Sequence, residues 1–90
     1  MAEFLNDALG FAKGQGVTML CDCSGDDHEG TFHTVPAGAN GTIDSIVRYP
    51  SQGITFTVVI ETTARDAEGD ICYIVNSFDE TDGKPNQFFK

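Results

Sequence analysis

The residues with metal-binding chemistry lie in one short stretch, Cys21-Asp22-Cys23, followed by His28 and His33. Thiolate sulfur and imidazole nitrogen suit Zn²⁺, which takes four ligands in a tetrahedron. Common zinc knuckles separate their cysteines by at least two residues, whereas here only Asp22 lies between them. Side chains at this spacing on a strand share one face, so both would reach one ion only if the backbone were distorted. We therefore predict no metal and no other cofactor, with core thiols and solvent-facing histidines.

The chain has three cysteines, which cannot all pair with one another. A bridge between Cys21 and Cys23 would be strained, because side chains on one face of a strand run parallel. Reduced thiols are typical of the cytoplasm. The N-terminus lacks a basic segment followed by an apolar one, and no apolar run approaches the roughly 20 residues of a membrane span. These features predict a cytoplasmic protein.

The formal net charge is −9, from fourteen Asp and Glu against five Lys and Arg. Such a chain repels nucleic acid phosphates and anionic membranes, since binding to either depends on Lys and Arg. We therefore predict no nucleic-acid partner and no membrane partner. The acidic residues form three groups, at 22–29, 61–70 and 79–82. In a small barrel we expect the first two groups to lie toward opposite ends, which argues against one continuous acidic face.

The first acidic group is locally dense, with Asp26, Asp27 and Glu29 around His28. Calcium accepts such oxygen donors, but the D-x-D-x-D-G register of a calcium loop is absent, so we expect a solvated loop. Catalysis by a nucleophile and a base needs a third orienting group and a pocket. The chain has no G-x-S-x-G, P-loop or dinucleotide motif, and we predict that it is not an enzyme.

The elements that must position these residues are mostly strands. Apolar residues at three- and four-residue spacing predict a helix over 2–13. Over 17–89 the period changes to two, most clearly at 54–61, and the strands follow one another without intervening helices. We therefore predict one mostly β domain over 1–90. It is a small antiparallel barrel of about four to five strands with a short N-terminal helix.

A glycine-rich turn, Val35-Pro36-Ala37-Gly38-Ala39-Asn40-Gly41, leads into one of the predicted strands. Gly38 and Gly41 can take positive φ, and they let the backbone run close to a neighbouring strand. The other residues of the same pattern are Gly14, Val17, Ile43 and Ile46.

This pattern, G-x-x-V followed by a variable loop and G-x-x-G-x-[IV]-x-x-[IV], resembles that of SH3-like small barrels with a KOW-like turn. Small bacterial and mobile-element proteins share the turn. The resemblance covers about residues 14–75 and implies an SH3-like barrel. RNA-binding KOW domains carry Lys and Arg around this turn, whereas here only Arg48 is nearby, so RNA binding is not expected.

Aromatic side chains beside the predicted loops offer large contact areas to a peptide. The predicted binding residues are Tyr49, Tyr73, Phe32, Asp26, Asp27 and Glu29. For Phe32 and Phe78, core lining or loop anchoring is the favoured alternative. The function that we predict is a non-enzymatic small β-barrel module that binds a protein partner or forms a homo-oligomer through an open strand edge. The alternative is an acidic inhibitor from a phage or mobile element, which mimics nucleic acid toward a basic nucleic-acid enzyme.

Overall fold

The computed structural model describes residues 1–90, and it confirms the mostly β class. The strands are β1 (Glu3–Leu5), β2 (Asp7–Ala8), β3 (Phe11–Ala12), β4 (Gly16–Thr18), β5 (Cys23–Asp26), β6 (Phe32–Val35), β7 (Asn40–Tyr49), β8 (Gly53–Arg65) and β9 (Ile71–Asp79). Two 3₁₀ helices, η1 (Glu80–Asp82) and η2 (Pro85–Gln87), follow β9. No helix has the length and apolar character needed to cross a membrane.

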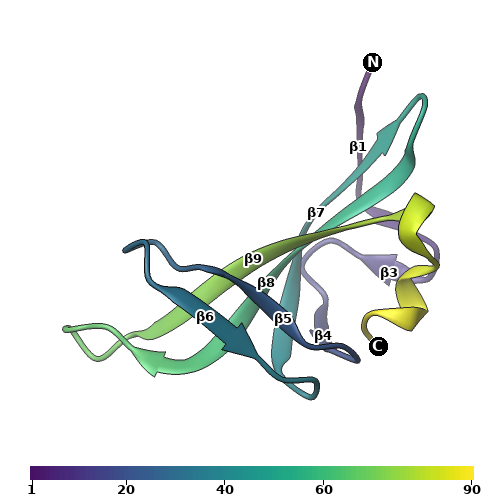
Figure 1. Ribbon diagram of the computed structural model, residues 1–90. Helices are drawn as coiled ribbons and strands as arrows, with labels where there is room; N and C mark the ends of the chain where they lie inside the picture. Colours follow the sequence, from purple (N-terminus) through teal and green to yellow (C-terminus); the bar gives the residue numbers. More distant parts are fainter.

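One antiparallel sheet forms the centre of the molecule, with strands in the order β1-β7-β8-β9 (Figure 1). β7 connects its parts, because β4 pairs with the first residues of β7 and β1 with the last. The alternation predicted at 54–61 is confirmed in β8, where Ile54, Phe56, Val58 and Ile60 are all buried. Burying each of these side chains contributes roughly 1.5–3 kcal/mol to folding.

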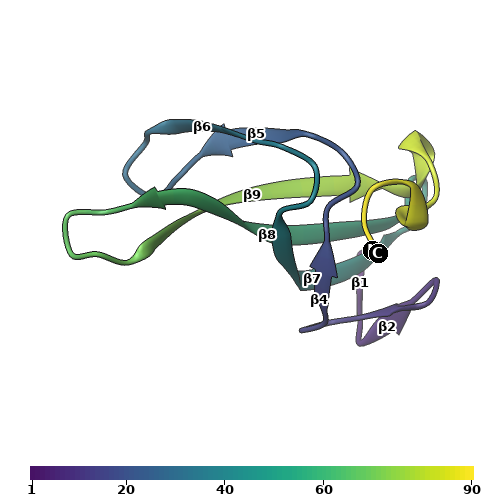
Figure 2. The same cartoon turned by 90° about the horizontal axis from the view of Figure 1, so that it is seen from below.

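The β5–β6 hairpin forms a second layer over the inner face of β8 and β9 (Figure 2). β5 lies close to β9, where Nδ2 of Asn76 donates a hydrogen bond to the backbone carbonyl of Ser24 at 3.1 Å. The main core cluster contains Val17, Met19, Cys23, Val35, Ile43, Ile46, Ile54, Phe56, Val58, Ile60, Ile74 and Phe89.

The predicted small antiparallel barrel is wrong, because none of the antiparallel sheets closes into a barrel. β5 and β6 pair only with each other, over a register that runs from Cys23↔Val35 to Asp26↔Phe32. Cys23 and Val35 are nevertheless buried, since the hairpin packs face to face on the sheet. A period of two specifies which face of a strand is buried, but it does not specify which strand its backbone pairs with.

The predicted helix over 2–13 is also wrong, and this segment forms β1, β2 and β3. Leu9 and Gly10 have φ angles of 53° and 90°, and they form the two-residue turn of the β2–β3 hairpin. β1 adds to the edge of β7, where Nη1 of Arg48 donates to Oε1 of Glu3 at 3.0 Å. An isolated helix of about 12 residues is marginal in water, so pairing with an existing sheet is the more stable arrangement.

The glycine-rich turn uses its two glycines differently. Gly38 has a φ of 99°, and its N–H donates to the carbonyl of Met19 at 2.7 Å. At Gly41 the expected positive φ is absent, whereas the expected close approach to a neighbouring strand is present. An added Cβ at Gly41 would lie 2.9 Å from Cγ1 of Val58 and 3.3 Å from the carbonyl oxygen of Val59. Gly38 is therefore required by the turn, and Gly41 by the close approach of β7 to β8.

Candidate functional site

The loop between β5 and β6 is closed by the side chain of Asp27. Its Oδ1 accepts hydrogen bonds from the backbone N–H groups of Glu29 at 2.9 Å and Thr31 at 3.0 Å. Gly30 follows with a φ of 83°, in the left-handed region that favours glycine. The carboxylate thus replaces a backbone acceptor and holds the loop in one conformation.

The loop between β8 and β9 repeats this geometry. Oδ1 of Asp66 accepts from the N–H groups of Glu68 and Asp70, both at 2.9 Å. Gly69 has a φ of 88°. Both loops read D-x-E-G, and this repeated tetrapeptide is the sequence signal from which the twin turns could have been predicted.

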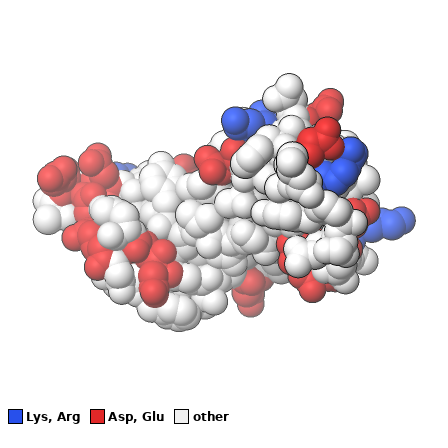
Figure 3. Space-filling model, turned by 90° about the horizontal axis from the view of Figure 1, so that it is seen from above, with Lys and Arg blue, Asp and Glu red and all other residues white.

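The two loops lie side by side at one end of the molecule. Ligand atoms of His28, Glu29 and Asp66 lie within 4.8 Å of one another. Figure 3 shows acidic side chains gathered at this end. The expectation that the first two acidic groups lie at opposite ends is therefore wrong. The β5–β6 hairpin lies over the β8–β9 hairpin with its turn at the same end, so the two turns meet (Figure 2).

We call the exposed or half-exposed carboxylates of this end the acidic tip, which consists of Asp26, Glu29, Asp66, Glu68 and Asp70. Arg65 is the only Lys or Arg next to either loop in the sequence. Its Nη1 donates to the backbone carbonyl of Gly69 at 2.7 Å. Since the guanidinium bonds to the loop backbone and to no carboxylate, most of the negative charge of the tip stays uncompensated.

Behind the tip, Asp27, His33 and Cys72 converge between the hairpin and β9, with ligand atoms within 4.8 Å of one another. Nε2 of His33 lies 2.6 Å from Oδ2 of Asp27, and 15% and 3% of these side chains are exposed. Cys72 is buried. The prediction of solvent-facing histidines holds for His28 and is wrong for His33, because His33 shares a face of β6 with buried Val35.

Protonation in this cluster is set by its contacts. The hydrogen bond from His33 lowers the pKa of Asp27 to about 2; burial opposes this effect, and the N–H groups of Thr31 and Glu29 support it. Burial raises the pKa of the Cys72 thiol, and the nearby charge of Asp27 raises it further. At neutral pH the cluster holds an ionised carboxylate and a protonated thiol. A buried, protonated thiol is a poor nucleophile, so the three residues do not form a Cys–His–Asp catalytic triad.

The cysteine–histidine cluster that the sequence order suggests is not assembled. Sγ of Cys21 lies 3.8 Å from the carbonyl oxygen of Phe88, and Sγ of Cys23 lies 3.6 Å from that of Cys21. Burial, with a further effect of Cys21, raises the pKa of Cys23 to about 12. The cysteine in the cluster with His33 is Cys72, which lies far from it in the sequence.

The predicted binding aromatics do not form one surface. Phe32 is 65% exposed on β6, Tyr73 is 44% exposed on β9, and Tyr49 is 37% exposed at the end of β7. Strand alternation turns Phe32 and Tyr73 away from the core that their layers share, so they lie on opposite sides of the molecule. Core lining is therefore wrong for Phe32, whereas the half-buried Phe78 stacks on Phe88 with ring centroids 5.1 Å apart.

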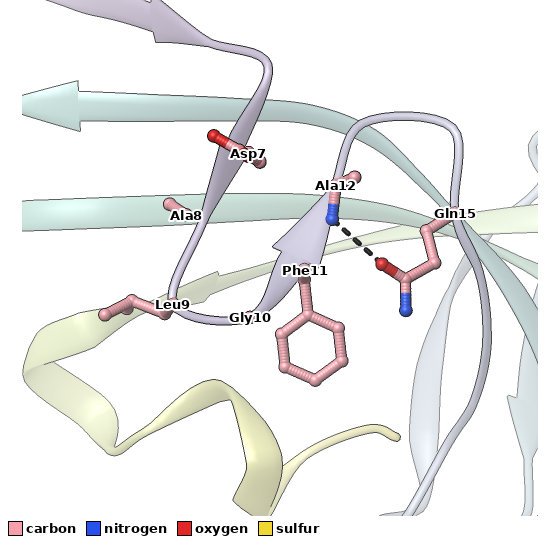
Figure 4. A pocket seen from close by; sticks show the side chains of 7 residues that line it. All are labelled: Asp7, Ala8, Leu9, Gly10, Phe11, Ala12 and Gln15. Carbon is pink, nitrogen blue, oxygen red and sulfur yellow. Dashed lines mark hydrogen bonds between the residues drawn. The ribbon is translucent and has the colours of Figure 1, made fainter.

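A surface hollow at the β2–β3 hairpin offers no catalytic pair. Asp7, Phe11 and Gln15 are among its lining residues (Figure 4). Oε1 of Gln15 accepts from the N–H of Ala12 at 2.9 Å, and Asp7 is the only titratable side chain in the lining. The lining contains no nucleophile and no second titratable side chain beside Asp7. The hollow therefore offers no pair of groups for nucleophilic or acid–base catalysis.

No protein-family model, curated protein or solved structure matches the chain. The resemblance to SH3-like barrels with a KOW-like turn therefore stays a prediction. Function has to be inferred from the chemistry of the acidic tip and of the buried cluster.

Proposed function

We propose that the chain is a non-enzymatic protein-binding module that presents its acidic tip to a basic surface of a partner protein. The observation that carries the proposal is the juxtaposition of the two D-x-E-G loops, which brings Glu29 of one loop next to Asp66 of the other. Two like charges at such a distance repel by about 1 kcal/mol in water. Lys and Arg side chains of a basic partner would offset this repulsion, because they attract both carboxylates.

Electrostatics favours a protein over other macromolecules as this partner. Nucleic acids and anionic lipids carry the same sign of charge as the tip and are repelled by it. Lys and Arg side chains of a partner would meet several carboxylates within one Debye length, about 8 Å at physiological salt. Such clusters speed association more than they raise affinity, so we expect binding that weakens steeply with salt.

A non-enzymatic role is supported by the state of the candidate catalytic groups. The Cys72 thiol is buried and its pKa is raised, while the Asp27 carboxylate is held by His33 and by two backbone N–H groups. Each group already has a structural partner or is shielded from solvent. Neither is poised to attack or to deprotonate a substrate.

A second candidate function, mimicry of nucleic acid toward a basic enzyme, is favoured by the same juxtaposition. A mimic needs its carboxylates along one continuous surface, and the meeting of the first two acidic groups supports this alternative. It is a special case of the first proposal, in which the partner's basic surface is a nucleic-acid site. Competition with DNA or RNA for that surface distinguishes the two.

Homo-oligomerisation through a strand edge is the weaker alternative. β9 pairs on one side only, and it exposes Tyr73 and Val75. This alternative depends on the open edge alone, whereas the acidic tip depends on the convergence of two separate loops.

The test compares two variants that change the charge equally. The tip variant carries Asp26→Asn, Glu29→Gln, Glu68→Gln and Asp70→Asn, which spares the loop-closing Asp27 and Asp66. The control carries Asp7→Asn, Asp44→Asn, Glu61→Gln and Asp82→Asn. Each removes four negative charges, so the net charge changes from −9 to −5 in both.

Binding is measured by calorimetry against a panel of purified basic DNA-binding and nuclease domains, at low and high salt, with DNA as competitor. We expect at least one domain to bind the wild type and the control variant. We expect the tip variant to bind that domain about tenfold or more weakly, since each exposed charge pair contributes up to about 1 kcal/mol. Equal weakening by both variants would show that only net charge matters, and it would refute a localised site.

A further inference from the structure

We propose that Asp27, His33 and Cys72 form a Zn²⁺ site between the β5–β6 hairpin and β9. The three ligands come from three segments, the β5–β6 loop, β6 and β9. Their ligand atoms lie within 4.8 Å of one another without any ion. This proposal is independent of the protein-binding function, because none of the three residues belongs to the acidic tip.

The geometry needs only a small adjustment to bind the ion. Zn²⁺ bonds of about 2.0–2.3 Å in a tetrahedron place ligand atoms about 3.3–3.6 Å apart. Oδ2 of Asp27 and Nε2 of His33, now 2.6 Å apart, would separate by roughly 0.7 Å as the ion replaces the proton between them. Sγ of Cys72 lies within 4.8 Å of a ligand atom of each of the other two residues and would move inward. The fourth position is left for water.

The donor set selects among metals. One thiolate, one imidazole and one carboxylate suit Zn²⁺, whereas Ca²⁺ and Mg²⁺ prefer oxygen donors alone. Binding forms the bonds Zn–Sγ, Zn–Nε2 and Zn–Oδ2. Cys72 releases its thiol proton to solvent. Nε2 of His33 gives up the proton that it donates to Oδ2 of Asp27, and the metal-bound ring is the neutral tautomer protonated on Nδ1, with the proton exchanged through solvent. The two charges of the ion balance the Asp27 carboxylate and the Cys72 thiolate, which leaves this buried site neutral.

The β8–β9 loop, which has the same D-x-E-G turn, can be compared with the β5–β6 loop. Asp66 closes its loop through Oδ1 as Asp27 does, so this turn does not require a histidine or a thiol behind the carboxylate. Only Asp27 has a mostly buried histidine on its second oxygen, with the buried Cys72 thiol nearby. The ligand-type residues around Asp66 are His28 and Glu29, which are exposed. The shared turn therefore does not explain why His33 and Cys72 converge on Asp27.

Metal binding is tested on the full chain after treatment with a chelator, by calorimetry with Zn²⁺ and by absorption spectroscopy with Co²⁺. We expect one equivalent of Zn²⁺ to bind. We expect Co²⁺ to show a thiolate charge-transfer band together with the visible absorption of a tetrahedral ion. A wild type that binds less than one equivalent, or a Co²⁺ complex without the thiolate band, would overturn the proposal.

Variants assign the ligands. Cys72→Ser should abolish the thiolate band and weaken Zn²⁺ binding at least tenfold, while Cys21→Ser and His28→Ala should leave both unchanged. His33→Gln provides a second ligand variant if Cys72→Ser does not fold, as judged by circular dichroism. Loss of binding in His28→Ala but not in His33→Gln would place the ion at the exposed cluster and refute the buried site. The tip variant should still bind Zn²⁺, so this proposal can fail or succeed separately from the first.

Discussion

Replacing Phe89 by alanine should remove a large part of the stability of this protein. Phe89 is fully buried although it is the second-last residue. Its ring centroid lies 4.7 Å from that of Phe11, 5.6 Å from that of Phe56 and 5.7 Å from that of Phe78. Removing a buried Phe side chain costs about 3–5 kcal/mol. At 0.05–0.15 kcal/mol per residue, a chain of 90 residues has a total stability of about 5–13 kcal/mol.

The assay is equilibrium urea unfolding followed by far-UV circular dichroism, since the chain has no Trp. A loss of about 4 kcal/mol corresponds to a Tm lower by roughly 15–30 °C. Phe32→Ala is the matched control, because the same atoms are removed from a side chain that is 65% exposed. We expect it to change stability by no more than about 0.5 kcal/mol. Equal effects of the two substitutions, or a loss below about 1 kcal/mol in Phe89→Ala, would refute the packing of the C-terminus on the core.

Two further predictions concern the glycine-rich turn and the loop carboxylate. Gly41→Ala should lower the free energy of unfolding by about 1–3 kcal/mol, because its Cβ would lie 2.9 Å from Cγ1 of Val58. Gly16→Ala, on the paired strand β4, is the control, because its added Cβ would meet nothing closer than 4.0 Å and should leave stability nearly unchanged. Urea unfolding of the two variants measures the difference. Similar losses of stability in both would contradict the prediction. The folded-state pKa of Asp27, about 2, lies below its ordinary value of 3.8, so the stability that this group adds is complete above about pH 4 and is lost as the pH falls toward 2. Between about pH 4 and pH 2, the urea midpoint of Asp27→Asn should therefore fall less than that of the wild type. Parallel pH profiles of the two proteins would show that the ionised Asp27 carboxylate does not stabilise the fold.

The strands of the main sheet could be predicted because their signal is local. In β8, apolar residues recur at every second position from Ile54 to Ile60, and this spacing alone places them on one face. The same kind of reasoning failed over 2–13, where three- and four-residue spacing favoured a helix. There, β1 completes its hydrogen bonds on the edge of β7 and the turn at Leu9 and Gly10 reverses the chain. These contacts are not local, so the spacing of apolar residues could not reveal them.

In the candidate site, too, some features depend on neighbouring residues and others on contacts between distant segments. The sequence by itself determined the acidic character of both loops and the turn chemistry of D-x-E-G, since an Asx-type turn depends on a few neighbouring residues. Only the tertiary structure decided that the loops meet, that no sheet closes into a barrel, and that Cys72, rather than Cys21 or Cys23, lies beside His33. The physical reason is that the layers pack through apolar faces that many strand arrangements could bury. The arrangement of the β5–β6 hairpin over β8 and β9 selects which distant polar residues come together.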